Sequence, residues 1–302
     1  MKALEIVGVE KEFGKTKILK GVNFDVPEHS VFGFLGQNGA GKTTTMKIVL
    51  GLLKPDAGLV RVFGEPVSYG ETKTNRMIGY LPDVPEFYGY MTPKEYLRLC
   101  GEIAGMSGHD IKVKSENLLE LVGLKECKKR IGAFSRGMKQ RLGIAQALLN
   151  EPQLLICDEP TSALDPVGRK EILDILSKVK ERTTVVFSTH ILSDVERICD
   201  QIAILHNGTI AMSGELKELK ARYAKNQLEL VFRNEWDKER FMEHAKMQEY
   251  GKSIQEEELH LFIEDTDAAG EILNLLSASR LVPIKFEQKE ATLEKLFLEV
   301  VQ

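Results

Sequence analysis

A glycine-rich segment near the start of the chain has the residue types needed to bind phosphate. Residues 36–43 read GQNGAGKT, which fits the phosphate-loop pattern G-x-x-x-x-G-K-[ST]. Glycines let backbone N–H groups close around phosphate oxygens, Lys42 can neutralise the terminal phosphates, and the Thr43 hydroxyl can bind Mg²⁺. The alternative is an ordinary glycine-rich turn between a strand and a helix. The nucleotide-binding candidates are Gly36, Gln37, Asn38, Gly39, Ala40, Gly41, Lys42, Thr43 and Thr44.

Two adjacent carboxylates at the end of an apolar run could complete such a site. The run LLIC is followed directly by Asp158 and Glu159, and ligands of open α/β sheets bind at the carboxyl ends of the strands. Asp158 could hold Mg²⁺ directly or through water, and Glu159 could orient or deprotonate an attacking water. Alone, the pair could also be a charged turn after a core strand. Together with the phosphate loop, it predicts Mg²⁺-assisted hydrolysis of a nucleoside triphosphate.

A predicted helix start between these two motifs could bind a second anion. In FSRGMKQRLGIAQALL, Ser135 and Gly137 open a helix, and the first backbone N–H groups of a helix lack partners within it. By itself the segment is better explained as a capped amphipathic helix. Its position 23 residues before Asp158 favours a role in the same chemistry.

The elements around these residues predict strands covered by helices. Residues 30–36 form a short apolar run before the glycine loop, and a helix follows with apolar residues at helical spacing, ending near Lys54 because of Pro55. Residues 153–157 and 183–189 are apolar on both faces, as in buried parallel strands, with a helical stretch between them. The pattern is helical over about 90–150, where Thr92 and Glu95 form a capping box.

Length and periodicity indicate two domains. The 302 residues exceed the usual size of one domain. We expect a nucleotide-binding domain over residues 1–220 and an accessory α+β domain over residues 223–302, with the charged segment 217–222 as a linker.

Charge and hydropathy exclude several classes of protein. Lys and Arg number 41 and Asp and Glu 45, for a net charge of −4, whereas proteins that hold nucleic acid usually carry a basic excess. We therefore expect no nucleic-acid partner. The sequence has neither a run of about 18 apolar residues nor a basic segment followed by an apolar one at its start. We expect a cytoplasmic protein without a membrane span of its own.

These motifs together resemble the ATP-binding subunit of an ABC transporter. The matching positions, in the order of the family, are Phe13 as the aromatic that stacks on adenine, residues 36–43 as Walker A, residues 134–140 as the signature, residues 154–159 as Walker B, residues 162–165 as the D-loop, and His190 as the switch histidine. Without the resemblance, Phe13 could be a core residue and His190 a structural one. The signature and the tail ATLEKLFLEVV are similar to the subgroup that works with ABC-2-type membrane subunits.

The resemblance implies a P-loop NTPase core of the ABC type. Its mixed α/β architecture has an antiparallel β subdomain and a helical subdomain, followed here by a small C-terminal α+β domain. It further implies ATP and Mg²⁺ as cofactors, with Lys42, Glu159 and His190 as catalytic residues and Thr43 and Asp158 at the metal. The implied partners are an ABC-2-type permease that exports its substrate and a second ATP-binding subunit, with the chain peripheral on the inner face of the cell membrane.

The sequence departs from the family at three positions. Asp83 stands where the family usually has a glutamine that reaches Mg²⁺ and the attacking water. An aspartate could still bind the metal, although its side chain is shorter and charged. Arg136 and Met138 replace the usual glycine and glutamine of the signature, whereas Ser135 and Gly137, which the family uses to contact the γ-phosphate, are present.

The implied mechanism joins two subunits head to tail. Each ATP lies between the Walker motifs of one subunit and Ser135 and Gly137 of the partner subunit. We expect the segment 83–90, which contains Phe87, Tyr88 and Tyr90, to dock the membrane subunit. The alternatives are ordinary aromatic packing in that segment and, for the whole chain, a soluble ABC-type ATPase acting on ribosomes or DNA, or a regulatory nucleotide-binding module.

Overall fold

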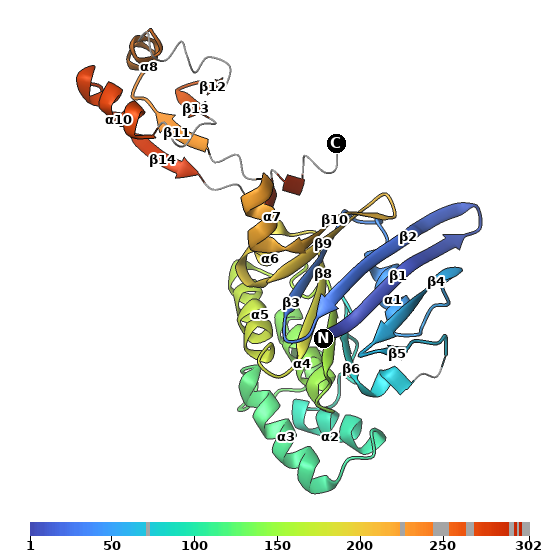
Figure 1. The fold of residues 1–302 in the computed structure, drawn as a ribbon. Coiled ribbons are helices and arrows are strands. Elements are labelled where there is room, and N and C mark those ends of the chain that lie inside the picture. The colour runs from blue at the N-terminus through green and yellow to red at the C-terminus, as the bar shows by residue number, and fades with distance from the viewer. Residues whose placement is uncertain are drawn as a thin grey trace. The chain divides into compact units, whose positions relative to one another are not determined.

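The computed structural model divides the chain into two compact units, Met1–Leu216 and Lys217–Val300 (Figure 1). It describes residues 1–70, 73–223, 227–243, 254–263, 269–289, 293–294 and 296–297. Each unit has its own hydrophobic core.

A six-stranded sheet forms the centre of the first unit, in the order β10-β9-β3-β8-β7-β6. The strands β9, β3, β8, β7 and β6 run parallel, and β10 pairs antiparallel with β9. Every residue of β3, β7 and β8 is buried, as predicted for parallel strands covered by helices. The predicted α/β class is therefore confirmed. The bounds are β3 (Val31–Leu35), β6 (Ile78–Leu81), β7 (Leu154–Asp158), β8 (Thr184–Thr189), β9 (Gln201–His206) and β10 (Thr209–Glu215).

A second, antiparallel sheet packs against the first helix of the chain. Its order is β2-β1-β4-β5, and α1 (Lys42–Val49) contributes to one core with both sheets. Phe24 of this sheet stacks on Phe32 and Phe34 of β3, with ring centroids 5.4 and 5.0 Å apart. The bounds are β1 (Lys2–Phe13), β2 (Thr16–Pro27), β4 (Ala57–Val62) and β5 (Glu65–Pro66). The two sheets thus fix the helix that carries Lys42 and Thr43.

The first helix ends earlier than its sequence predicted. We expected it to continue to about Lys54, but α1 ends at Val49. Gly51 follows with φ 68°, a left-handed conformation that glycine adopts readily, and its N–H bonds to Ile48 O. A glycine therefore ends this helix before Pro55 can.

Three helices form the part of the first unit that the sequence predicted to be helical. They are α2 (Pro93–Ile103), α3 (Gly108–Leu121) and α4 (Arg136–Leu148), and the first two lie at the lower end of the view in Figure 1. The predicted capping box is present at Thr92 and Glu95. The 3-10 turns Lys73–Arg76 and Ile131–Ala133 lie in the connections, and α5 (Pro166–Val179) and α6 (Leu192–Ile198) cover the sheet.

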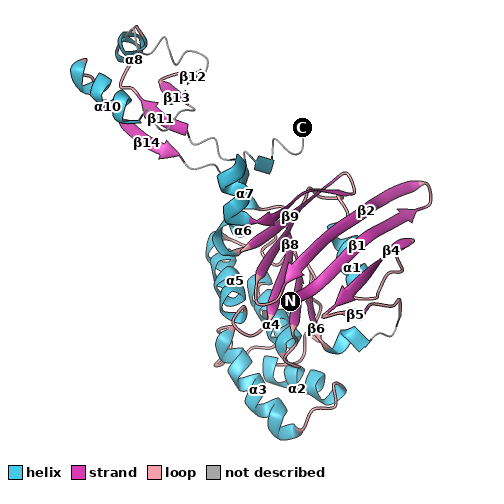
Figure 2. Cartoon of the chain, viewed as in Figure 1, coloured by secondary structure: helices cyan, strands magenta, loops and turns pink. Residues whose placement is uncertain are grey.

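The second unit is a four-stranded antiparallel sheet with helices, shown by type in Figure 2. Its sheet order is β12-β13-β11-β14, and α8 and α10 contribute to its core. The bounds are β11 (Gln227–Val231), α8 (Glu235–Met242), β12 (Ile254–Glu257), β13 (His260–Ile263), α10 (Ala269–Ala278) and β14 (Lys285–Lys289). The tail that carries the sequence ATLEKLFLEVV lies mostly outside the described residues.

The segment expected to be a linker is helical. Residues 217–222 lie within α7 (Leu216–Tyr223), whose buried Leu216 and Leu219 are three positions apart and share one face. The many charged residues of the segment led to the prediction of a linker, although the spacing of Leu216 and Leu219 is that of a helix face. Within the part of the chain that the structure describes, we find no helix with the length and apolar character required to cross a bilayer.

Candidate functional site

The carboxyl ends of four neighbouring parallel strands bring most of the predicted residues to one edge of the central sheet. The phosphate loop follows β3, His190 follows β8, Asp158 ends β7 and Asp83 lies just beyond β6. These strands are adjacent in the order β3-β8-β7-β6 (Figure 1). Residues far apart in the sequence therefore meet where ligands of open α/β sheets bind.

The phosphate loop joins β3 to α1 and turns back on itself. Ala40 N donates to Gln37 O at 3.1 Å. Gly41 caps α1 with φ 111°, and a Cβ at that position would lie 2.7 Å from a methyl carbon of Leu19. Only glycine fits this conformation and this space. The Nζ of Lys42 is buried and donates to Gly36 O at 2.7 Å, so the lysine folds back over its own loop.

Thr43 and Asp158, the two predicted metal ligands from separate motifs, are in direct contact. The Thr43 hydroxyl donates to Asp158 Oδ2 at 2.8 Å. Asp158 is almost fully buried, and its second oxygen accepts a hydrogen bond from the Ser188 hydroxyl at 2.5 Å. Both carboxylate oxygens therefore have a fixed donor, which holds the group in one orientation.

Ser188 is a functional residue that the sequence analysis missed. Besides binding Asp158, its hydroxyl accepts a hydrogen bond from Glu159 N at 3.1 Å. One side chain on β8 thus holds the carboxylate of Asp158 and the backbone of Glu159 at the end of β7. A signal existed, because Ser188 is a polar residue inside the apolar run VVFST just before His190.

We expect Ser188→Ala to raise the Mg²⁺ concentration needed for half-maximal ATP hydrolysis by about tenfold. A hydrogen bond to a charged group contributes about 1.5–3 kcal/mol, and tenfold corresponds to about 1.4 kcal/mol. Mg²⁺ titrations of the ATPase rate measure this shift. Nucleotide affinity in excess EDTA should not change.

Thr183→Val provides the matched control for Ser188→Ala. It removes a buried hydroxyl just before β8, one that donates to Pro152 O at 3.0 Å and lies away from the strand end that carries Ser188. An equal shift in both variants, or none in Ser188→Ala, would contradict a specific role of Ser188 at the metal.

Glu159 lies between the two other predicted catalytic residues. Its Oε1 is 3.2 Å from Lys42 Nζ, and its Oε2 is 2.9 Å from His190 Nδ1. Oε1 is buried, and the contact with Lys42 is an ion pair without hydrogen-bond geometry. The backbone of Glu159 is left-handed, with φ 47°, which is uncommon for a residue with a side chain. The structure brings Lys42, Glu159 and His190 together.

Asp83 lies near the same carboxylates but has a different partner. Burial raises the pKa of its carboxyl, the negative charges of Asp158 and Glu159 act in the same direction, and Arg136 opposes them. Burial together with Asp158 also raises the pKa of the Tyr80 hydroxyl, to about 12. Arg136 Nη2 donates to Asp83 Oδ1 at 2.9 Å. The site therefore gathers three carboxylates, and Asp83 is paired with a cation from another element.

The signature residues lie at the start of α4. Ser135 caps the helix, its hydroxyl accepting from Met138 N at 3.2 Å, and the residue is exposed. Gly137 lies beside Leu164, whose methyl carbon would be 3.7 Å from a Cβ added there. Ser135 is therefore accessible at the surface of the first unit, and Gly137 is partly so.

Phe13 lies at the end of β1 and is 50% exposed. Lys11 Nζ is 5.5 Å from its ring centroid. The strand that pairs with β1 brings Ile18 and Leu19 against Gly41 of the phosphate loop. An exposed ring near that loop could stack on a base, and its exposure argues against the alternative of a core residue.

The donor set around Thr43 fits Mg²⁺ better than a metal held by protein alone. In the described ranges, no group of three or more His, Cys, Asp or Glu could hold a metal ion. Mg²⁺ commonly takes one or two carboxylates and completes its shell with waters and phosphate oxygens. The fixed Asp158 carboxylate and the Thr43 hydroxyl match that requirement.

Comparison with known proteins gives two family matches. The model described as "ABC transporter" matches residues 19–162, and the model described as "ATP-binding protein DrrA1-3-like, C-terminal domain" matches residues 214–301. The two matches fall largely on the first and second units, respectively.

Relatives and solved structures agree with these matches. The chain is similar to the uncharacterized ABC transporter ATP-binding protein YxlF of Bacillus subtilis (strain 168), with 40% identity over 99% of both chains. It is also similar to the bacitracin transport ATP-binding protein BcrA of Bacillus licheniformis, with 42% identity over 74% of this chain and 72% of that one. A solved structure of an ATP-binding subunit of an ABC transporter is 33% identical, with a TM-score of 0.66, over 73% of this chain and 93% of that one.

Proposed function

Because the chain belongs to the ATP-binding subunits of ABC transporters, we propose that it drives export by Mg²⁺-dependent ATP hydrolysis in a head-to-tail dimer. Membership itself makes it an ATP-binding ATPase that powers transport through a membrane subunit. The family match confirms the main prediction from sequence and favours it over a ribosome- or DNA-directed ATPase. The contact of Lys42 and His190 with one carboxylate, Glu159, is the single observation that carries the chemistry.

The residues at the strand ends divide the work of hydrolysis. Lys42 neutralises the terminal phosphates, and the phosphate-loop N–H groups bind their oxygens. Glu159 accepts the proton of the attacking water, and His190 holds the Glu159 carboxylate and contacts the γ-phosphate. Thr43 and Asp158 would hold Mg²⁺, which when bound withdraws charge from the phosphates. Phe13 stacks on the adenine.

The second half of each site comes from another protomer in this proposal. Ser135 is exposed and Gly137 is partly exposed at the start of α4. Placed over the nucleotide of the other protomer, Ser135 and Gly137 of the partner subunit supply a hydroxyl and the N-terminal N–H groups of α4 to the γ-phosphate. We propose a homodimer in which ATP holds the protomers together and hydrolysis releases them.

The membrane subunit takes up the released energy. We propose an ABC-2-type permease as this partner, with the chain bound at the inner face of the cell membrane. The similarity to a bacitracin transport protein and the C-terminal domain match support an exporter of this subgroup. The decisive experiment is purification of the native complex from membranes, followed by identification of the second polypeptide. The ATPase rate of the purified complex is then measured with Mg²⁺ and with EDTA.

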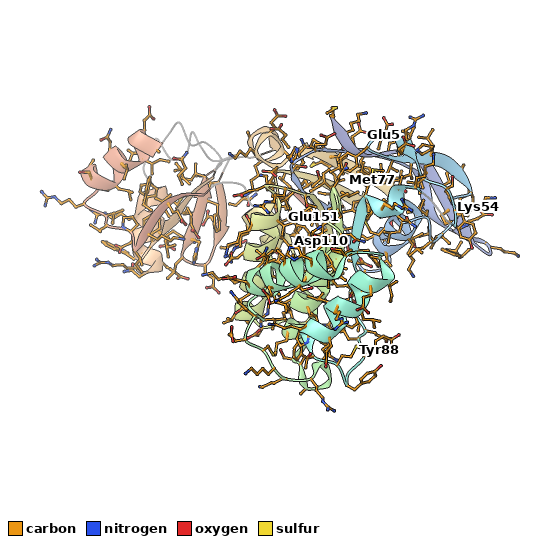
Figure 3. All side chains as sticks on the ribbon, turned by 90° about the horizontal axis from the view of Figure 1, so that it is seen from below. Glu5, Lys54, Met77, Tyr88, Asp110 and Glu151 are labelled. Carbon is orange, nitrogen blue, oxygen red and sulfur yellow. The ribbon has the colours of Figure 1, made fainter. Side chains whose placement is uncertain are left out.

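The exposed aromatic side chains after Asp83 form our candidate docking surface. Tyr88 and Tyr90 are 55% and 64% exposed, and their ring centroids are 5.9 Å apart. Figure 3 shows the labelled Tyr88 projecting from the ribbon. Phe87, which the sequence analysis grouped with them, is less exposed and packs against Tyr96, at 5.0 Å between centroids. The docking surface is therefore defined by Tyr88 and Tyr90.

We expect Tyr88→Ala with Tyr90→Ala to reduce the membrane subunit that co-purifies with the chain by about fivefold or more. Truncating an interface anchor typically costs more than about 1 kcal/mol. Tyr69→Ala is the matched control, since Tyr69 is 63% exposed outside this surface. Unchanged co-purification of the double variant would rule out this surface.

A further inference from the structure

One helix holds Asp83 by both its side chain and its main chain. Arg136, the first residue of α4, donates Nη2 to Asp83 Oδ1 at 2.9 Å. One turn later, the fully buried Gln140 donates Nε2 to Asp83 O at 2.6 Å. Gly143 follows against Leu81, because a Cβ at Gly143 would lie 2.5 Å from the Leu81 Cδ1. The segment after β6 and the start of α4 are thus joined.

The ion pair connects residues that face different nucleotides in the proposed dimer. Asp83 follows β6, whose Leu81 pairs with Cys157 directly before Asp158, so it belongs to the metal end of its own site. Arg136 stands between Ser135 and Gly137, the residues that we place against the nucleotide of the other protomer. In the single chain, these two charges neutralise each other.

Both members of the pair gain a stronger partner when the dimer closes. A triphosphate carries several negative charges, whereas Asp83 carries one, and the pair is partly exposed at 40% and 45% for the two side chains. Partly exposed ion pairs contribute little and exchange readily. Arg136 is therefore free to move to phosphate oxygens, and the carboxylate of Asp83 then becomes available to a cation.

We propose that Arg136 is a nucleotide-contacting residue that exchanges Asp83 for the nucleotide of the opposite site when two protomers close. This inference rests on the proposed head-to-tail dimer. In the open state, the ion pair keeps Asp83 occupied. In the closed state, the nucleotide bound by one protomer draws Arg136 of the partner subunit away from Asp83 of the partner subunit. Nucleotide binding at one site is thereby coupled to the state of Asp83 at the other site.

The exchange predicts opposite effects from breaking the same pair at its two ends. The experiment uses the full chain with Glu159→Gln, ATP and excess EDTA, and measures the dimer fraction by sedimentation velocity. Excess EDTA removes any contribution of Asp83 to metal binding. Asp83→Asn frees Arg136 and should strengthen dimerisation by about two- to fivefold for each pair released. Arg136→Ala removes the contact and should weaken dimerisation by about fivefold or more.

The double variant and a matched control complete the test. Asp83→Asn with Arg136→Ala should behave like Arg136→Ala alone, because no guanidinium remains to be freed. Arg98→Ala, which breaks the exposed Arg98–Glu102 pair of 2.8 Å on α2, should leave dimerisation unchanged. Arg136→Gln repeats the test with a longer side chain if the alanine variant has a lowered melting temperature.

The two ways of failing can be told apart. Shifts in the same direction from Asp83→Asn and Arg136→Ala, or no shift from either, would show that the pair is only a structural contact, and would leave the dimer standing. A Glu159→Gln parent that stays monomeric at saturating ATP would overturn the head-to-tail dimer and the exchange with it.

Discussion

Replacing Glu159 with Gln is expected to lower steady-state ATP hydrolysis by about 10²–10⁴-fold, the usual contribution of a general base. The glutamine side chain would keep the shape of the glutamate but could not accept a proton from water. The ion pair with Lys42, whose Nζ is 3.2 Å from Oε1, would also be lost, and the carboxylate that lies 2.9 Å from His190 Nδ1 would become an amide. ATP binding should persist, so the variant should accumulate as an ATP-bound dimer.

Two measurements check this variant. Phosphate release gives the rate, and sedimentation with and without ATP gives the oligomeric state. Glu151→Gln is the matched control, because Glu151, labelled in Figure 3, forms an exposed ion pair with Lys114 at 2.8 Å. A Glu159→Gln chain with full ATPase activity would remove Glu159 from the role of base.

Replacing Asp158 with Asn is the second variant with a large expected effect. We expect the Mg²⁺-dependent rate to fall by about 10²–10³-fold, because a metal ion stabilises the transition state by several kcal/mol. The amide would lack the charge that attracts the cation. It would also place an NH₂ donor opposite Thr43 or Ser188, both of which donate to Asp158 in the native chain.

Binding of Mn²⁺, followed by its paramagnetic resonance signal in the presence of nucleotide, tests this reason directly. The variant should bind nucleotide in EDTA as the native chain does but should no longer bind Mn²⁺ beside it. Asp174→Asn is the control, since Asp174 accepts a surface hydrogen bond from Arg197 at 2.9 Å. Mn²⁺ affinity equal to that of the native chain would place the metal elsewhere.

The fold around the phosphate loop could be predicted because each part is encoded locally. Around Lys42, the sequence contains a buried strand, then the candidate binding residues and then a helix, without interruption. A similar apolar strand directly precedes Asp158. Parallel pairing of β3, β8 and β7 then brings the strand ends together. Local order and sheet topology were sufficient to place these residues at one edge.

Other features depend on contacts between distant segments and could not be predicted. The pairing of Arg136 with Asp83 needs the packing of α4 against β6, which no local pattern specifies. Ser188 is a polar residue within a predictable strand, but the partners of its hydroxyl depend on the neighbouring strand β7. The left-handed backbone of Glu159 is likewise set by its surroundings, because its residue type does not favour that conformation.

The central claim is that each ATP site is assembled from two protomers, and the dependence of hydrolysis on chain concentration tests it most directly. The purified full chain is diluted in saturating MgATP, with the rate per chain and the sedimentation profile measured on the same samples. We predict that the rate per chain falls as the dimer dissociates. A constant rate per chain in samples that sediment only as monomer would contradict the account.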